Sequence, residues 1–229
     1  GASFANTTAC LAPDVFAGVG VSAGPSVGTS SSGAIGPCEQ ADVESRCRNL
    51  GGAYQSAFDT QVASIAHGDA DTTVNTCYNR QNAEGMAGLY GVNELPGSTT
   101  LNRDGGSAEE YLWQDGRVSM LWLNGLDHSW SGGQGASGSY VGSVSINYAR
   151  YLGEFFSNNN ARVDRNLAPS LSQVSAAPDG DRIQVSGYAD DEDGTVSRVD
   201  IVIDGLDGGG DNLTAGGDGS GFFQAASAP

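Results

Sequence analysis

Lysine is absent from this chain of 229 residues, and its ten basic residues, all arginine, oppose 27 acidic ones to give a net charge of −17. A surface this acidic repels phosphate backbones, so we expect no nucleic-acid partner. Long apolar runs are absent as well. Because a membrane-spanning helix needs about 18 apolar residues in succession, we expect no membrane partner either.

No signal peptide is visible, because the chain opens on Gly1-Ala2-Ser3-Phe4 without a start methionine, a basic region or a long apolar region. We expect a processed chain, or a piece that begins inside a domain.

Cysteine and histidine are scarce, with four cysteines in no CxxC pair and two histidines. This composition argues against a zinc site, so we predict no metal. An even number of irregularly spaced cysteines favours two disulfides and an oxidising compartment, which predicts a secreted protein. Three pairings are open. One of them, Cys38 with Cys47, would close a short local loop, and the sequence does not choose among them.

Residues 1–160 alternate helix-like and strand-like segments, which predicts an α/β domain with a mainly parallel sheet covered on both faces. Residues 24–37, rich in Gly, Ser and Pro, are expected to be loop. Asp115-Gly116 is a hairpin signal between two strand-like runs. Helical spacing predicts a last helix through Val141, Val144, Tyr148, Leu152 and Phe155. The other expected helices are 3–12, 39–49 and 75–90, and the other expected strands are 15–23 and 61–66.

Residues 161–169 are expected to be a linker, and residues 170–229 have alternating apolar residues separated by Asp-Gly turns. This pattern predicts a small all-β, immunoglobulin-like module, and its length suggests that it is incomplete. The acidic turn 190–194 lacks the first aspartate of an EF-hand loop, because Ala189 stands there. A single degenerate glycine-aspartate segment, 208–219, is not enough to predict a calcium site.

Two histidines could serve as a base. His128 lies in a glycine-rich stretch that follows an apolar strand, where open α/β sheets place chemistry. His67 directly follows the predicted strand 61–66, and we expect it to be structural, bonding to the turn that follows. That turn carries Asp69 and Asp71. A carboxylate after the penultimate strand and a histidine after the last one is the order of acid and base in α/β-hydrolases. The alternative is that Asp71 caps the next helix.

A G-x-S-x-G motif is centred on Ser22, and its order before Asp71 and His128 would suit a triad. A nucleophile elbow needs a strand, a sharp turn and then a helix. Gly24-Pro25 and a loop follow Ser22 instead, and too few helix and strand units remain before Asp71. We therefore expect the nucleophile upstream of Gly1, with residues 1–12 as the helix that follows it.

Four segments resemble the esterase family of extracellular polyhydroxybutyrate depolymerases and of feruloyl and acetylxylan esterases. The first, residues 1–17, is similar to the stretch after the catalytic serine. The second is the acid motif His67-Gly68-x-x-Asp71-Thr72-Thr73-Val74. The third is the histidine motif Gly125-Leu126-Asp127-His128-Ser129-Trp130-Ser131-Gly132-Gly133, in which Ser131 replaces the usual proline. Residues 146–156 resemble the closing helix of the depolymerases.

This resemblance implies the C-terminal half of an α/β-hydrolase sheet, and a secreted serine esterase whose serine lies two residues before Gly1. Asp71 would be the acid, His128 the base, and no cofactor would be needed. Trp130 and Tyr140 are candidate substrate contacts, or else pack against the histidine loop. The expected partner is a polymeric ester, a polyhydroxyalkanoate. The alternatives are a carbohydrate esterase and a non-catalytic polymer-binding derivative.

Overall fold

The computed structural model describes residues 1–163, 168–191, 195–206, 209–217 and 221–227. The chain divides into two units, Gly1–Val163 and Asp164–Pro229. Within the described part of the chain, no helix is long and apolar enough to cross a membrane. No cluster of three or more His, Cys, Asp or Glu side chains that could hold a metal ion is found among the described residues.

The first unit is built on a mixed sheet of five strands with the order β1-β2-β5-β4-β3. The first three strands in this order are parallel, and the last three are antiparallel. The prediction of a mainly parallel sheet was therefore wrong for the half formed by β3, β4 and β5. These three strands follow one another in the chain and pair antiparallel. The strands are β1 (Gly18–Ser22), β2 (Val62–Gly68), β3 (Thr99–Arg103), β4 (Gly106–Leu112) and β5 (Val118–Leu123).

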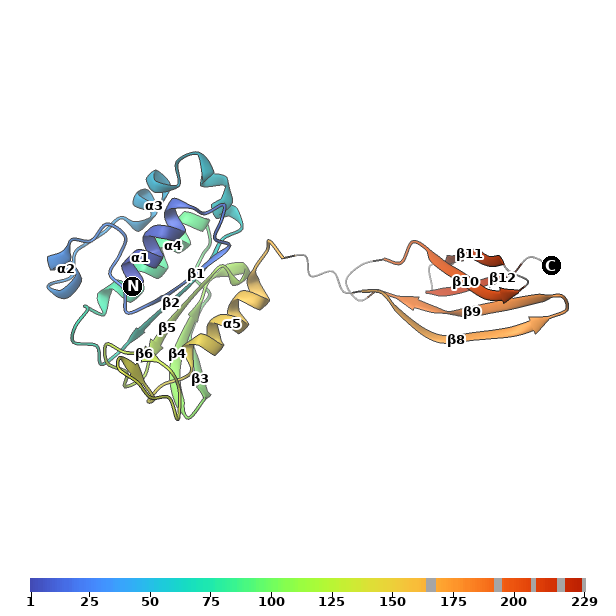
Figure 1. Cartoon of the computed structure of the whole chain (residues 1–229). Helices are drawn as coiled ribbons and strands as arrows, with labels where there is room; N and C mark the ends of the chain where they lie inside the picture. Colours follow the sequence, from blue (N-terminus) through green and yellow to red (C-terminus); the bar gives the residue numbers. More distant parts are fainter. Residues whose placement is uncertain (164–167, 192–194, 207–208, 218–220, 228–229) are drawn as a thin grey trace. The chain divides into compact units, whose positions relative to one another are not determined.

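Helices cover both faces of this sheet (Figure 1). One core packs three helices against the parallel strands, and a second core lies under the last helix on the other face. Strand β2 lies between these cores, and all seven of its residues are buried. The helices on the first face are α1 (Ala2–Leu11), α3 (Val43–Gly51) and α4 (Cys77–Tyr90); α5 (Tyr148–Asn159) covers the second.

Two local predictions were wrong. The segment 24–37 is not all loop, because it contains the short helix α2 (Ser31–Ile35), whose cap Ser30 accepts a hydrogen bond from the Gly33 amide. The last helix begins at Tyr148 rather than near Val141, because the Asn147 side chain caps it. The short pieces that remain are η1 (Gly52–Asp59), η2 (Gln114–Gly116), β6 (Trp130–Ser131) and β7 (Val141–Gly142).

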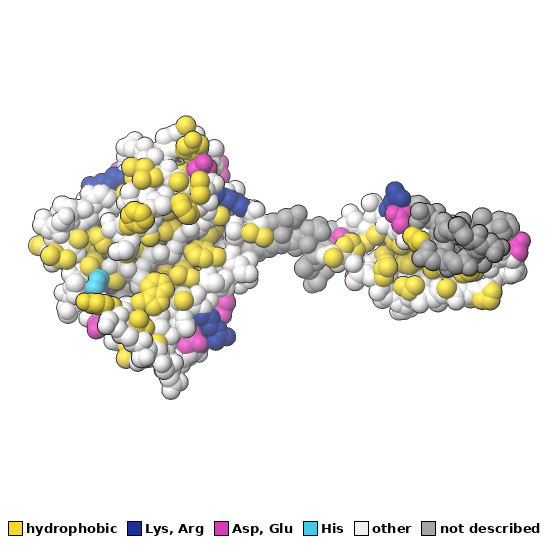
Figure 2. All heavy atoms as spheres, viewed as in Figure 1, with side chains coloured by type: hydrophobic (Ala, Val, Ile, Leu, Met, Phe, Trp, Pro, Cys, Tyr) yellow, Lys and Arg dark blue, Asp and Glu magenta, His cyan; other side chains and the backbone are white. Residues whose placement is uncertain are grey.

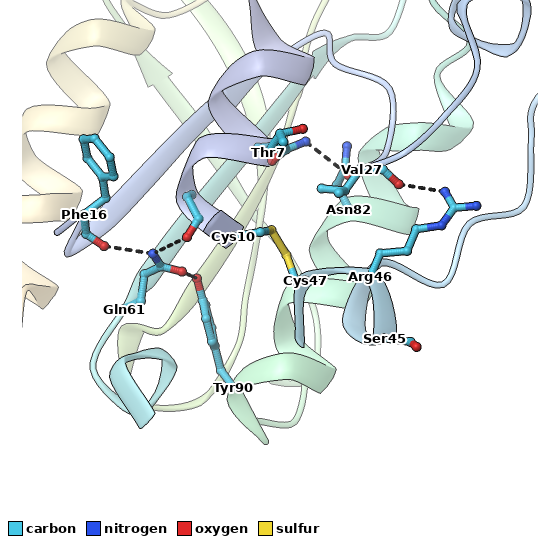
Figure 3. The surroundings of a disulfide bond; sticks show 12 residues. Thr7, Cys10, Phe16, Val27, Ser45, Arg46, Cys47, Gln61, Asn82 and Tyr90 are labelled. Atoms are coloured by element: carbon cyan, nitrogen blue, oxygen red, sulfur yellow. Dashed lines mark hydrogen bonds between the residues drawn. A yellow bond between two sulfur atoms is a disulfide. The ribbon is translucent and has the colours of Figure 1, made fainter. Parts of the chain in front are cut away.

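Two disulfides, Cys10–Cys47 and Cys38–Cys77, settle the pairing that the sequence left open. The local pair Cys38–Cys47 is not formed. The first disulfide joins α1 to α3, beside a buried Gln61 that donates to the Ala9 and Phe16 carbonyls and accepts from the Tyr90 hydroxyl (Figure 3). Cross-links of this kind fit an oxidising compartment.

Reduction of the disulfides is expected to destabilise the first unit substantially. The bonded cysteines are separated by 37 and 39 residues in sequence, and loops of that length correspond to about 4 kcal/mol for each disulfide. Urea unfolding with and without a reductant measures the effect. The paired variant Cys38→Ala/Cys77→Ala isolates one cross-link, and an unfolding midpoint that stays unchanged would contradict this expectation.

The second unit contains only strands and loops among its described residues. Its five strands form an antiparallel sheet with the order β10-β11-β12-β9-β8 around a small core of Val185, Ala189 and Phe223. The immunoglobulin-like assignment, which requires two packed sheets, stays a prediction. The segments 190–194 and 208–219, neither of which was predicted to bind calcium, include residues outside the described ones. The strands are β8 (Ser170–Asp179), β9 (Arg182–Asp190), β10 (Val199–Leu206), β11 (Gly209–Gly217) and β12 (Phe222–Ala226).

Candidate active site

The acid turn follows the C-terminal end of β2, and the histidine loop follows the C-terminal end of the neighbouring parallel strand β5. Backbone hydrogen bonds join the two: Asp69 N donates to Leu123 O, and Ala70 N donates to Leu126 O. The Asp69 carboxylate also accepts from the Gly125 amide at 2.7 Å. These contacts therefore hold together the two segments that carry Asp71 and His128, independently of the hydrogen bond between those two side chains.

Gly68 makes this close approach possible. A Cβ atom at this position would lie 2.1 Å from Leu126 O and 2.7 Å from Asp127 O, both of which are backbone atoms. Only glycine lets the acid turn pass so near the histidine loop. This gives a steric reason for Gly68 in the acid motif.

Asp71 has a fully enclosed side chain, and four N–H groups donate to it. Oδ1 accepts from the backbone amides of Thr73 at 2.8 Å and Val74 at 3.0 Å. Oδ2 accepts from His128 at 2.8 Å and from His67 at 3.0 Å. Burial alone would raise the pKa of Asp71, but the hydrogen bonds from His128, Thr73 and Val74 outweigh it and hold the pKa below its ordinary value.

His128 faces Asp71 with one ring nitrogen and leaves the other unbonded. Nδ1 is the atom 2.8 Å from Asp71 Oδ2, so it carries the proton that the carboxylate accepts. In the neutral ring Nε2 then has a free lone pair, and it makes no hydrogen bond with any described residue. The side chain is 38% exposed. This arrangement fits a base that is oriented by an acid and open to a reactant.

His67 bonds to the turn that follows it, as the sequence predicted. Its Nε2 lies 3.0 Å from Asp71 Oδ2 and 3.2 Å from the Val74 carbonyl oxygen. The ring is completely buried. Burial lowers the pKa of His67 below its ordinary value, although the Asp71 carboxylate opposes the shift. The folded protein therefore keeps this ring neutral.

The free energy of unfolding is expected to fall as the pH drops below about 6.5. An unfolded His67 takes up a proton near its ordinary pKa of 6.5, whereas the folded one stays neutral there. The unfolded state then binds more protons, so stability falls by up to about 1.4 kcal/mol per pH unit. Urea unfolding of the wild type and of His67→Gln across this range measures the difference, and equal pH slopes would contradict it.

A groove of about 610 Å³ runs beside His128. Trp130 and Tyr140, the predicted substrate contacts, both line it, and so does the N-terminal end of α1. Figure 2 shows histidine atoms at the surface beside hydrophobic side chains. Of the two histidines, His67 is buried, whereas the side chain of His128 is partly exposed. The small residues that line the groove were not predicted from the sequence, because they have no distinguishing feature there apart from their size. The lining residues are Gly1, Ala2, Ala5, Gly20, Ser22, Ala23, His128, Ser129, Trp130 and Tyr140.

The two aromatic residues differ in how they are held. Trp130 packs on the buried Tyr148 ring of α5, with 5.4 Å between ring centroids, and stays 38% exposed. Tyr140 is 83% exposed and has a backbone φ of 62°. Trp130 therefore both packs against α5 and lines the groove, whereas Tyr140 is almost free at its rim.

Ser22 ends β1 and also lines the groove, but no helix follows it directly. The next residue, Ala23, donates its amide to Ala66 O, and the first helix after it is α2, which begins only at Ser31. No hydrogen bond joins Ser22 to His128 among the described residues. The strand-turn-helix geometry of a nucleophile elbow is therefore absent at Ser22.

Comparison with known proteins adds one finding to this geometry. Over 178 residues, 31% are identical to a poly(3-hydroxybutyrate) depolymerase of Ralstonia pickettii, covering 75% of this chain. The chain is similar to a polyester depolymerase. It spans only 36% of the length of that relative. No family model matches the chain.

Two solved structures show a weaker likeness. They are a serine-to-alanine variant of a PHB depolymerase complexed with an R3HB trimer and the PHB depolymerase from Penicillium funiculosum, with TM-scores of 0.46 and 0.45. Each is 15% identical, and each match covers 82% of this chain and 60% of the other. A likeness with TM-scores below 0.5 supports no conclusion about the function of this chain.

Proposed function

We propose that this chain carries the acid and base of a secreted serine esterase of the α/β-hydrolase type that hydrolyses a polyester such as poly(3-hydroxybutyrate). The observation that carries the proposal is the 2.8 Å hydrogen bond between Asp71 and His128 beside a groove, with His128 Nε2 unbonded among the described residues. The 31% identity to a polyester depolymerase supports the substrate class. The two disulfides support secretion.

The nucleophile of this proposal is a serine two residues before Gly1. Gly1 and Ala2 line the same groove as His128, which supports a serine just upstream of them as the partner of that ring. Helix α1 begins at Ala2, so a serine at that position would stand directly before a helix, as an elbow requires. Its N-terminal amides favour negative charge and would help to stabilise an oxyanion.

In the proposed reaction the serine oxygen attacks the ester carbonyl while His128 Nε2 takes its proton. The resulting imidazolium is stabilised by Asp71. When the carbon–oxygen ester bond breaks, His128 returns the proton to the departing alcohol and an acyl-enzyme remains. Water then attacks the acyl group with the same help from His128, releasing the acid and restoring the serine. Every proton removed in the cycle is given back through one nitrogen atom.

Trp130 and Tyr140 are proposed as substrate contacts. The described residues that line the groove include no arginine, which suits an uncharged ester rather than an anionic substrate. Small side chains from α1 and β1 leave room for a short acyl unit beside the two aromatic rings. The second unit is proposed as an immunoglobulin-like spacer or surface binder for the polymer.

Expression of the gene with its upstream codons tests this proposal. We expect the protein to clear a suspension of poly(3-hydroxybutyrate) and to release no ferulate or acetate from xylan. Release of ferulate or acetate without clearing would replace the polyester by a carbohydrate ester. Absence of all activity, with a residue other than serine two positions before Gly1, would make the chain a polymer binder and overturn the proposal.

A further inference from the structure

Asp71 Oδ2 accepts hydrogen bonds from two imidazole rings, and only one of them borders the groove. His67 Nε2 is 3.0 Å and His128 Nδ1 is 2.8 Å from this one oxygen. His67 Nε2 also lies 3.2 Å from the Val74 carbonyl oxygen. Because both of its neighbours are acceptors, His67 Nε2 must carry the ring proton. His67 Nδ1 is then bare, and it is buried without a hydrogen-bond partner among the described residues.

The second ring limits how the carboxylate can turn. With the two backbone amides on Oδ1 alone, the carboxyl group could still rotate about its own axis and swing Oδ2 away from His128. The N–H of His67, whose ring does not line the groove, gives Oδ2 a second donor besides His128. All four donors together leave Asp71 a single orientation.

His67 is itself held rigidly. It lies in the wholly buried strand β2, between β1 and β5, and is paired in register with Trp122. The two rings are 6.5 Å apart between centroids. A donor on a central strand is a firmer support than one on a loop, because its backbone is fixed by neighbouring strands on both sides. The ring does not line the groove, so it has no direct route to a reactant.

We propose that His67 is a positioning residue, whose Nε2–H fixes Asp71 Oδ2 on the line to His128 Nδ1 and so keeps the lone pair of His128 at Nε2. This inference rests on the proposed function, since the orientation of His128 matters for catalysis only if that ring is the base. The bare Nδ1 of His67 is the cost of the arrangement, because a buried acceptor is left unsatisfied.

Two variants of matched size separate positioning from filling space. His67→Gln retains an N–H donor near the position of Nε2, and His67→Met removes the donor while keeping an unbranched side chain of similar length. Long-range nitrogen NMR spectra of the histidine rings report the tautomer of each, and this chain contains only two histidines. We expect the wild type to show Nε2–H at His67 and Nδ1–H at His128.

In His67→Met the fraction of His128 in the Nδ1–H tautomer should fall at least about twofold, and the pKa of Asp71 should rise because its carboxylate loses one donor. In the full-length protein, kcat on a soluble ester should fall on the order of 10- to 100-fold with little change in KM. His67→Gln should restore most of each quantity. A merely structural role predicts that neither the tautomer nor the Asp71 pKa differs between two folded variants.

Three results would overturn the inference: Nδ1–H at His67 in the wild type, an unchanged His128 tautomer in His67→Met, or identical spectra for the Met and Gln variants. The first result is measured on the wild type alone, so it can overturn the inference even if His67→Met does not fold. If the tautomers follow the expectation while the full-length protein hydrolyses no ester, the proposed function fails and the positioning of Asp71 by His67 stands.

Discussion

Replacing His128 by alanine is expected to lower ester hydrolysis by the full-length protein about a million-fold in kcat, the loss typical when the base of a triad is removed. The physical reason is that Nε2 is the atom that takes the serine proton and later returns it to the departing alcohol. Substrate binding does not need that transfer, so KM should change little. Initial rates on a soluble ester and clearing of a polyester suspension measure both quantities.

Asp127→Asn is the matched control, because Asp127 precedes His128 in the same loop and its side chain is exposed. This variant should keep the wild-type kcat within a few-fold. If His128→Ala retained a tenth of the wild-type rate while remaining folded, the proposed mechanism would be wrong.

Replacing Asp71 by asparagine should lower kcat about 10⁴-fold without unfolding the protein. The backbone amides of Thr73 and Val74 would keep the amide oxygen at the Oδ1 position. The new NH₂ group would then lie where Oδ2 now accepts from His128. Two donors cannot bond to each other, so His128 would move its proton to Nε2 and lose its function as a base.

Asp69→Asn controls for a general effect of charge in the acid turn. Asp69 accepts from the Gly125 amide and makes no hydrogen bond to either histidine among the described residues. Its loss should cost less than tenfold in kcat. A larger effect at Asp69 than at Asp71 would contradict the choice of acid. Tautomer measurements on Asp71→Asn provide a second check, since they must find the His128 proton on Nε2.

The pattern of apolar residues predicted the buried helices and strands correctly. It did not predict the strands that are only partly buried. Residues 75–90 and 61–66 were predicted well, because α4 has buried residues at helical spacing and β2 is a short, continuously buried run. Strand β3 was not predicted, since it lies at the edge of the sheet and most of its polar residues are exposed. Its neighbour β4 has Glu109 and Glu110 within the strand, so the sequence indicated only its end.

Capping and pairing decided the other differences. Val141 and Val144 matched the helical period of the last helix. However, Val141 lies in β7 and pairs with Trp130 of β6, and the Asn147 cap sets the start of α5. Spacing alone cannot separate a helix from an irregular segment that precedes it with apolar residues at the same period. The disulfide pairing was open for a similar reason, because it depends on which segments lie side by side in the fold.

The candidate site was more accessible to sequence reasoning than the sheet around it. His128 and Asp71 lie on short loops that directly follow strands, and loops of this kind meet wherever those strands are parallel neighbours. The shared use of Asp71 Oδ2 by both histidines could not be predicted, because it depends on side-chain orientation. Nor could the sequence show that Ser22 and the start of α1 border one groove.

The central claim is that Asp71 and His128 serve a serine that lies two residues before Gly1. The most direct measurement is to label the full-length protein with a fluorophosphonate and to identify the modified peptide by mass spectrometry. We expect one adduct on that upstream serine, which disappears in His128→Ala. An adduct on Ser22 instead, or labelling that is unaffected by His128→Ala, would contradict the claim.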